Sequence, residues 1–195
     1  MDSLDLAVWV LLGLLAASVL WAIVTYNKLV RLRNRADAVW ADIDVQLKRR
    51  HDLVQNLVEV VEAYAMHERG TFDDVTRARS EAVAAQSPED QAHAENVLSG
   101  ALARLIATAE AYPELEAEER FQALHEDLRE LEDAIALARH AYNLSVQAYN
   151  NNVQTVPTNV VAWIVSFTPR EFLSAPASET GVPAVEFDLP VAVRR

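Results

Sequence analysis

Histidines and carboxylates are the side chains best suited to chemistry in this sequence, because the chain contains no cysteine. The absence of cysteine excludes thiolate nucleophiles, thiolate metal ligands and disulfides. His67-Glu68 and His125-Glu126 each begin the metal-binding pattern His-Glu-x-x-His, but Thr71 and Arg129 stand where the second histidine is needed. We therefore expect solvated surface histidines and no bound metal or other cofactor.

The carboxylates give an equally weak signal for catalysis. Di-iron sites in helical bundles use paired Glu-x-x-His motifs, and Asp90-His93 is the nearest approximation here, at a helix start where Asp90 also serves as a cap. No Gly-x-Ser-x-Gly motif or phosphate-binding glycine loop is present. We therefore predict a protein that is not an enzyme, with a carboxylate-containing metalloprotein or hydrolase as the alternative. Four glutamates cluster at the N-terminus of the last long helix, where negative charge interacts favourably with the helix dipole: Glu114, Glu116, Glu118 and Glu119.

The N-terminal part of the chain has the composition of a membrane span. Residues 6–24 are 19 residues with one polar member, Ser18, and as a helix they measure about 28 Å, close to the thickness of a hydrocarbon core. Asp2 and Asp5 precede this stretch, whereas a cleavable signal peptide begins with basic residues. We therefore predict an external N-terminus at residues 1–5 and a retained transmembrane helix at residues 6–25.

The residues that flank the span predict its orientation and depth. Lys28 and Arg31 follow it and no basic residue precedes it, so the positive-inside rule places the N-terminus outside and the bulk of the chain in the cytoplasm. Trp9 and Trp21 lie near its two ends, where indole rings prefer the membrane interface. Gly13 and Ala17 form a small-xxx-small pair, which either allows two spans to pack as a homo-oligomer or, as we favour, arises by chance in a span rich in alanine and leucine.

Residues 26–155 have the pattern of a cytoplasmic helical bundle. Apolar residues recur every three or four positions from Trp40 to Ala65, with a gap at Arg50 and His51, and Gly70 is expected to end this helix. Thr71 with Asp74 predicts the start of a second helix, and Ser87-Pro88 with Asp90 predicts the start of a third. The third helix is expected to bury Val97, Ala101, Leu105 and Ala109.

The fourth helix, expected to run for about 40 residues from Pro113, carries the clearest seam of the bundle or coiled-coil type. Its length matches the first helix, and two shorter helices lie between them, so we predict an all-α fold with an antiparallel up-down four-helix bundle. The predicted seam is Phe121, Leu124, Leu128, Leu131, Ile135, Ala138, Tyr142 and Tyr149.

This topology brings residues 156–174 back to the bilayer. Residues 160–167 are apolar but too short to span, so they either plug the base of the bundle or dip into the headgroup layer with Trp163 and Phe167 at the interface. Residues 175–195 form a short, proline-punctuated, irregular tail with a weak strand signal.

Charge is distributed unevenly along the chain. The net charge is −12, which disfavours nucleic acid as a partner, yet Lys48, Arg49 and Arg50 are consecutive on the first helix. They either pair with acidic residues of the other helices or belong to a surface that docks a protein partner. The predicted docking surface comprises Asp44, Gln46, Lys48, Arg49, Arg50, Asp52 and Asn56.

In this same stretch the chain resembles the LemA family of bacterial membrane proteins. The resemblance implies one N-terminal transmembrane helix, an antiparallel helical bundle in the cytoplasm and no agreed catalytic residues, and related proteins are associated with membrane organisation. Gln55 replaces a proline that is frequent in the family, so we expect a straighter first helix. Residues 160–167 lack the glycine common there, so the bend that this segment makes in the family is not expected here. The matching residues include Tyr26-Asn27, Leu29-Val30, residues 32–35, Trp40, residues 43–50, Asp52-Leu53, residues 56–59, His67-Glu68, Tyr112-Pro113, Ala138-Arg139, Tyr142-Asn143, Tyr149-Asn150 and Pro157.

These observations predict a membrane-anchored, non-catalytic scaffold or adaptor at the bacterial inner membrane. Its bundle surface would be presented to a protein partner whose identity the residues do not specify. Peripheral lipid binding at the base of the bundle, through Trp163 and Phe167, is a third alternative.

Overall fold

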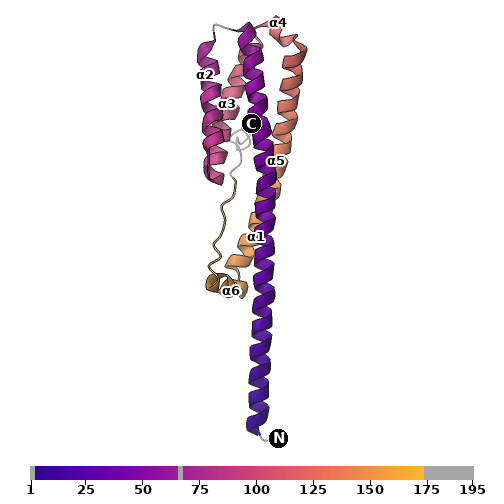
Figure 1. Ribbon diagram of the computed structural model, residues 1–195, viewed down its shortest axis with the longest axis vertical. Helices are drawn as coiled ribbons and strands as arrows, with labels where there is room; N and C mark the ends of the chain where they lie inside the picture. The colour runs from indigo at the N-terminus through magenta and orange to yellow at the C-terminus, as the bar shows by residue number, and fades with distance from the viewer. Residues whose placement is uncertain (1–2, 66–67, 174–195) are drawn as a thin grey trace, which may run out of the picture.

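The first helix runs through most of the length of the molecule (Figure 1). The structure, a computed structural model, describes residues 3–65 and 68–173, so the predictions for His67 and for residues 175–195 lie outside the described part. Helix α1 (Ser3–Tyr64) contains 62 residues, or about 93 Å at 1.5 Å per residue, and it passes from the apolar to the charged half without a break. All regular structure in the described residues is helical, which confirms the all-α prediction.

The second helix begins earlier than its sequence predicts. Helix α2 (Arg69–Ala84) includes Gly70 in its first turn, and α1 has already ended at Tyr64. The predicted N-cap at Thr71 is wrong because the Thr71 N–H already donates to the carbonyl of Glu68, at 3.0 Å. Glu68 is the N-cap, and it makes no side-chain capping bond.

The third helix starts as predicted. Helix α3 (Pro88–Ala109) follows Ser87, whose Oγ accepts from the Asp90 N–H at 3.1 Å. Ala101, Leu105 and Ala109 are buried as expected, but Val97 is 40% exposed and the prediction that it is buried is wrong. Leu98 occupies the inward position instead, since adjacent helical residues point about 100° apart.

The predicted fourth helix is interrupted near its start. A short helix, α4 (Pro113–Glu116), turns Leu115 into the core and ends in a tight turn at Ala117 and Glu118. Helix α5 (Glu119–Gln154) then continues for 36 residues, and the predicted seam is buried along it except at Ala138, which is half-buried.

Within the described part of the chain, the helices share three apolar clusters along α1. In Figure 1, α2, α3 and α5 lie beside the distal part of α1, and α5 alone continues toward α6. The distal cluster contains residues of α1, α2, α3, α4 and α5, including Val61, Val75, Leu105, Leu115 and Leu124. The other two clusters lie closer to the apolar stretch of residues 6–24 and are formed mainly by α1 and α5.

Helix α6 (Thr158–Ile164) closes the base of this domain. Val161 and Ala162 pack in the third cluster with Leu29, Tyr149 and Val153. After α6 the chain reverses and runs as an extended segment, residues 168–173, which we name the strap (Figure 1).

Candidate functional site

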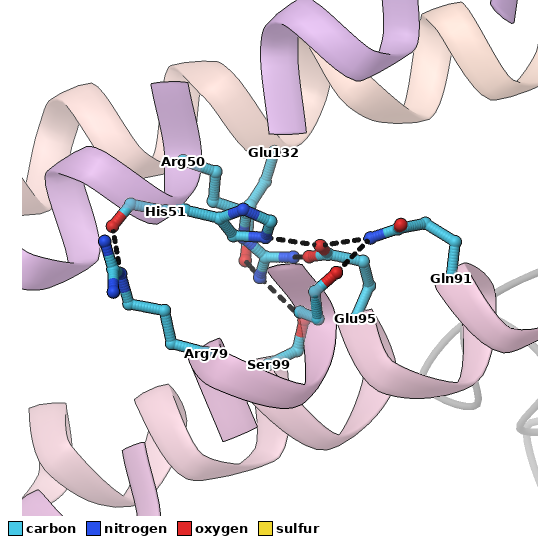
Figure 2. A network of polar contacts seen from close by, with 8 residues as sticks. Arg50, His51, Arg79, Gln91, Glu95, Ser99 and Glu132 are labelled. Carbon is cyan, nitrogen blue, oxygen red and sulfur yellow. Dashed lines mark hydrogen bonds and ion pairs between the residues drawn. The ribbon is translucent and has the colours of Figure 1, made fainter. Parts of the chain in front are cut away.

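The most unusual feature of the interior is a group of polar residues at the gap in the apolar stripe of α1. Figure 2 shows side chains from α1, α2, α3 and α5 converging there. Arg50 is 2% exposed, His51 7% and Glu95 1%, although residues of these types rarely lie inside a protein without partners. We name this group the polar cluster; it consists of Arg50, His51, Arg79, Gln91, Glu95, Ser99 and Glu132.

Glu95 of α3 is the central acceptor of the polar cluster. Its Oε2 accepts from Nη1 of Arg50 at 2.6 Å. Its Oε1 lies 2.8 Å from Nε2 of His51 and also accepts from Nε2 of Gln91 at 3.0 Å. Three partners therefore compensate for the removal of this carboxylate from water.

Arg50 connects Glu95 at the centre of the polar cluster to helix α5. Its Nη2 donates to Oγ of Ser99 and to Oε1 of Glu132, each at 2.7 Å, so that one guanidinium joins α1, α3 and α5. Arg79 of α2 donates from Nε to the backbone carbonyl of His51 at 2.7 Å. The polar cluster thus ties four helices together at one level.

The protonation of Glu95 follows from these contacts. Burial raises the pKa of this carboxyl, but the hydrogen bond from His51 and the positive charge of Arg50 together lower it below its ordinary value of 4.5. Glu95 is therefore a carboxylate at neutral pH, suited to hold Arg50 and His51 in place.

A histidine paired with a carboxylate is also half of a general-base arrangement, but the surroundings do not complete it. The groove beside His51 measures about 320 Å³, and we name it groove B. No serine, threonine or cysteine is among the described residues that line it. The contacts of His51 and Glu95 are therefore better suited to fixing how the helices pack against one another than to nucleophilic catalysis. Groove B is lined by Asp44, Leu47, Lys48, His51, Asp52, Arg79, Ala82, Val83, Ala85 and Gln91.

The other candidate metal and acid residues are dispersed. His93, His125 and His140 are exposed, but His51 is buried, so the expectation of surface histidines throughout is wrong at His51 because Glu95 and the neighbouring helices surround it. Asp90 is engaged with Ser87 at the cap of α3. No group of three or more potential metal ligands occurs within residues 3–65 and 68–173.

The predicted docking residues divide between the interior and two grooves. Arg50 is buried in ion pairs, as the pairing alternative expected for it, and is not available on the surface. Asp44, Lys48 and Asp52 line groove B. Gln46, Arg49 and again Asp52 line a groove of about 530 Å³ between α1 and α5, which we name groove A. Asn56 is exposed on α1 outside both grooves.

The predicted membrane-interface residues also differ in their surroundings. Trp9, Trp21, Lys28 and Arg31 are exposed along α1, and Trp163 of α6 is 81% exposed. Phe167 is half-buried instead, with its ring centroid 6.0 Å from that of Tyr26 and 6.4 Å from that of Tyr149.

Two asparagines of α5 hold the strap. Asn150 donates to the carbonyl of Arg170 and accepts from its N–H, both at 2.8 Å. Asn143 makes the same pair of bonds to Leu173, both at 2.9 Å. Seven residues of helix and three of extended chain each span about 10 Å, so the two asparagines match the spacing of the strap.

Comparison with known proteins shows which family the chain belongs to. The sequence model of the LemA family matches residues 39–187, which is more than half of the chain. The chain belongs to the LemA family.

Three curated relatives of this LemA-family chain carry one name, magnetosome protein MamQ. Two copies from Paramagnetospirillum magneticum, MamQ 1 and MamQ 2, are each 26% identical over 184 residues, covering 80% of this chain and 68% of their own length. MamQ of Magnetospirillum gryphiswaldense is 27% identical over 195 residues, covering 86% of this chain and 72% of its own.

A long apolar helix agrees with the membrane association expected of a LemA-family protein. Among the described residues, α1 is long and apolar enough to cross a membrane, and the most apolar window of α1 is not buried by any other part of the chain. The family membership and this helix indicate a membrane-associated helical protein.

The sequence of this LemA-family chain pointed to only part of these sites. The gap at Arg50 and His51 was visible, but nothing in the spacing of α3 marked Glu95 as the inward acid among its neighbours. The repeated Tyr-Asn pairs, Tyr142-Asn143 and Tyr149-Asn150, were the available signal for the strap site, since residues seven apart share a helix face.

Proposed function

We propose that this LemA-family chain is a non-catalytic scaffold anchored in the bacterial inner membrane, with an antiparallel four-helix bundle that presents its surface to a cytoplasmic protein partner. The observation that carries the proposal is the continuity of α1. One uninterrupted helix joins an apolar span, whose most apolar window is not buried by the rest of the chain, to the buried cores of the helical domain. Such a helix holds the domain at a fixed distance from the bilayer.

The charges near the span support the proposed orientation. Lys28, Arg31, Arg33 and Arg35 follow the apolar stretch and are exposed, whereas the described residues before it carry only the acidic Asp5. By the positive-inside rule, this distribution supports a cytoplasmic location for residues 26–173. Protease added to spheroplasts, in which the outer face of the inner membrane is accessible, should leave this portion undigested, and digestion without lysis of the inner membrane would contradict the orientation.

The polar cluster supports a structural role for the charged interior. The charged groups of Arg50 and Glu95 are partnered by other groups of the same chain. Buried ion pairs often add little net stability because desolvation offsets their attraction, and we propose that this one instead sets the register of the helices. A registered set of four helices is what a scaffold requires.

Groove A is the surface that we propose for the partner. Asp52, Asp127 and Glu130 line it with a single basic residue, Arg49, and Leu53 and Leu131 supply an apolar floor. This composition favours a partner segment that carries basic side chains beside an apolar one, because complementary charges favour association and disfavour wrong partners.

Site-specific crosslinking in cells tests the partner surface. A photoreactive residue at Gln46, in groove A, is expected to give a discrete adduct, and one at Val97, exposed on α3, is expected to give none. Glu130→Lys should abolish the adduct, because it reverses a charge that attracts the basic partner, while Glu119→Lys, the same charge change at the start of α5, should leave it. Equal adducts from both positions, or an adduct insensitive to Glu130→Lys, would contradict a partner site in groove A.

A further inference from the structure

We propose that α6 is a second membrane contact, which docks the base of the helical domain onto the surface of the bilayer that α1 spans. The proposal rests on the proposed anchoring by α1. It assigns to the exposed face of α6 one occupant, the headgroup and upper acyl region of that membrane.

The packing of α6 fixes its level along α1. Val161 and Ala162 are buried against Leu29, and Ala22 and Leu32 pack at the edge of the same cluster. The ring of Tyr26 contacts that of Phe167, which follows α6. Helix α6 therefore lies beside residues 22–32, where the apolar stretch of residues 6–24 ends and the first basic residues begin.

The opposite face of α6 is apolar and open. Val160, Trp163 and Ile164 are spaced so that they share one helix face, and they are 54%, 81% and 67% exposed. Val156, just before the helix, is 75% exposed. A contiguous apolar face that includes a tryptophan marks an interaction site, and indole rings favour the membrane interface.

A shallow groove extends this face toward the strap. It measures about 570 Å³, and Val153, Val160, Trp163, Phe167 and Pro169 supply most of its lining. Because the groove lies at the same level as the end of the span, lipid that surrounds the span also reaches the groove. A short amphipathic element of this kind lies in the interface plane and does not cross the membrane.

The electrostatics favour an anionic membrane surface. Residues 155–169 contain no acidic or basic side chain, so burying α6 in the interface removes no charge from water. Lys28, Arg31, Arg33 and Arg35 are exposed on the adjacent turns of α1. Arg170 pairs with Asp37 at 2.6 Å, and Glu171 adds one exposed negative charge, so the four basic residues of α1 leave the net exposed charge at this level positive.

Spin labels report the depth of α6 directly, because a chain without cysteine accepts a single introduced cysteine as its only label. We would reconstitute the full chain in vesicles of phosphatidylethanolamine and phosphatidylglycerol, with one cysteine at Ile164, Leu14 or Leu137. These three residues are 67%, 62% and 72% exposed, so none of the substitutions removes core packing. Collisions with oxygen indicate lipid, and collisions with a water-soluble nickel chelate indicate water.

The three positions separate the possible results. We expect oxygen-dominated collisions at residues 14 and 164 and nickel-dominated collisions at residue 137, with vesicles lacking phosphatidylglycerol shifting residue 164 toward water. A water signal at residue 164 with a lipid signal at residue 14 would overturn docking by α6 and leave the anchor intact. A water signal at residue 14 would overturn the anchoring itself. Lipid signals at both 164 and 137 would also overturn the proposal, because contact would then not be specific to α6.

Discussion

Arg50 and Glu95 form an ion pair in which Nη1 and Oε2 are 2.6 Å apart and the two side chains expose 3% and 0% of their surface. The pair joins α1 to α3 at the level where the apolar stripe of α1 is interrupted. Its exclusion from water makes each partner dependent on the other, since a lone buried charge is costly.

Arg50→Met should lower the free energy of unfolding by about 3–5 kcal/mol, because Glu95 then stays buried without its guanidinium partner. Arg49→Met is the matched control, since Arg49 is exposed, and it should change the free energy by less than about 0.5 kcal/mol. Urea unfolding of the full chain in detergent measures both. Combining Arg50→Met with Glu95→Met should cost less than the sum of the single changes, and strict additivity would contradict the coupling.

The pH dependence of stability follows from Glu95. Its pKa is lowered in the folded chain, so the unfolded chain binds more protons near the ordinary value of 4.5. The stabilisation from Glu95 is therefore complete above that pH and is lost as the pH falls through the lowered folded pKa. Glu95→Gln should therefore reduce the loss of unfolding free energy at low pH, measured by unfolding titrations between pH 7 and pH 3. A loss as steep as that of the parent protein would show that other carboxylates cause it.

The seam of α5 supports a comparison within one helix. Leu128 is 5% exposed and Leu137 is 72% exposed, so the same truncation can be made inside and outside the core. Leu128→Ala should cost about 2–5 kcal/mol, and Leu137→Ala should be close to neutral. Similar shifts in the melting midpoint for both variants would contradict the burial of this face.

The strap should depend on its asparagine contacts. Asn150→Ala removes two hydrogen bonds to Arg170 and should cost about 1–3 kcal/mol, since each neutral bond contributes about 0.5–1.5 kcal/mol. Amide exchange at Arg170 should accelerate, while Asn151→Ala, on the exposed neighbour, should leave it unchanged. Unaltered protection of Arg170 in Asn150→Ala would show that the strap is held by other contacts.

Local periodicity predicted the helices well and their ends less well. The seam from Phe121 to Tyr149 and the Ser87 cap depend on residues close in sequence, so both could be read directly. The start of α2 could not be read in this way, because hydrogen bonds to the Glu68 carbonyl already begin the helix before the capping pattern at Thr71. The break at Ala117 was missed because it serves the burial of Leu115, which is a tertiary effect.

The interior site could be predicted only in part for the same reason. Three consecutive basic residues point around three sides of a helix, so at least one must approach the interior or a neighbouring chain, and Arg50 lies in the interior. Which acid meets it depends on the packing of α3 against α1, and sequence spacing cannot rank Glu95 above other glutamates. His51 was misassigned to the surface because its burial depends on a partner 44 positions away.

The continuity of α1 from the apolar span to the distal core is the claim on which the scaffold depends, and a distance between two spin labels tests it most directly. Val24 and Glu62 are exposed on α1 and 38 residues apart, or about 57 Å in an uninterrupted helix. Pulsed electron resonance on the doubly labelled full chain in a bilayer should give a narrow distribution centred near that distance. A broad distribution, or one centred at a clearly shorter distance, would show a hinge between membrane and domain and would contradict the account.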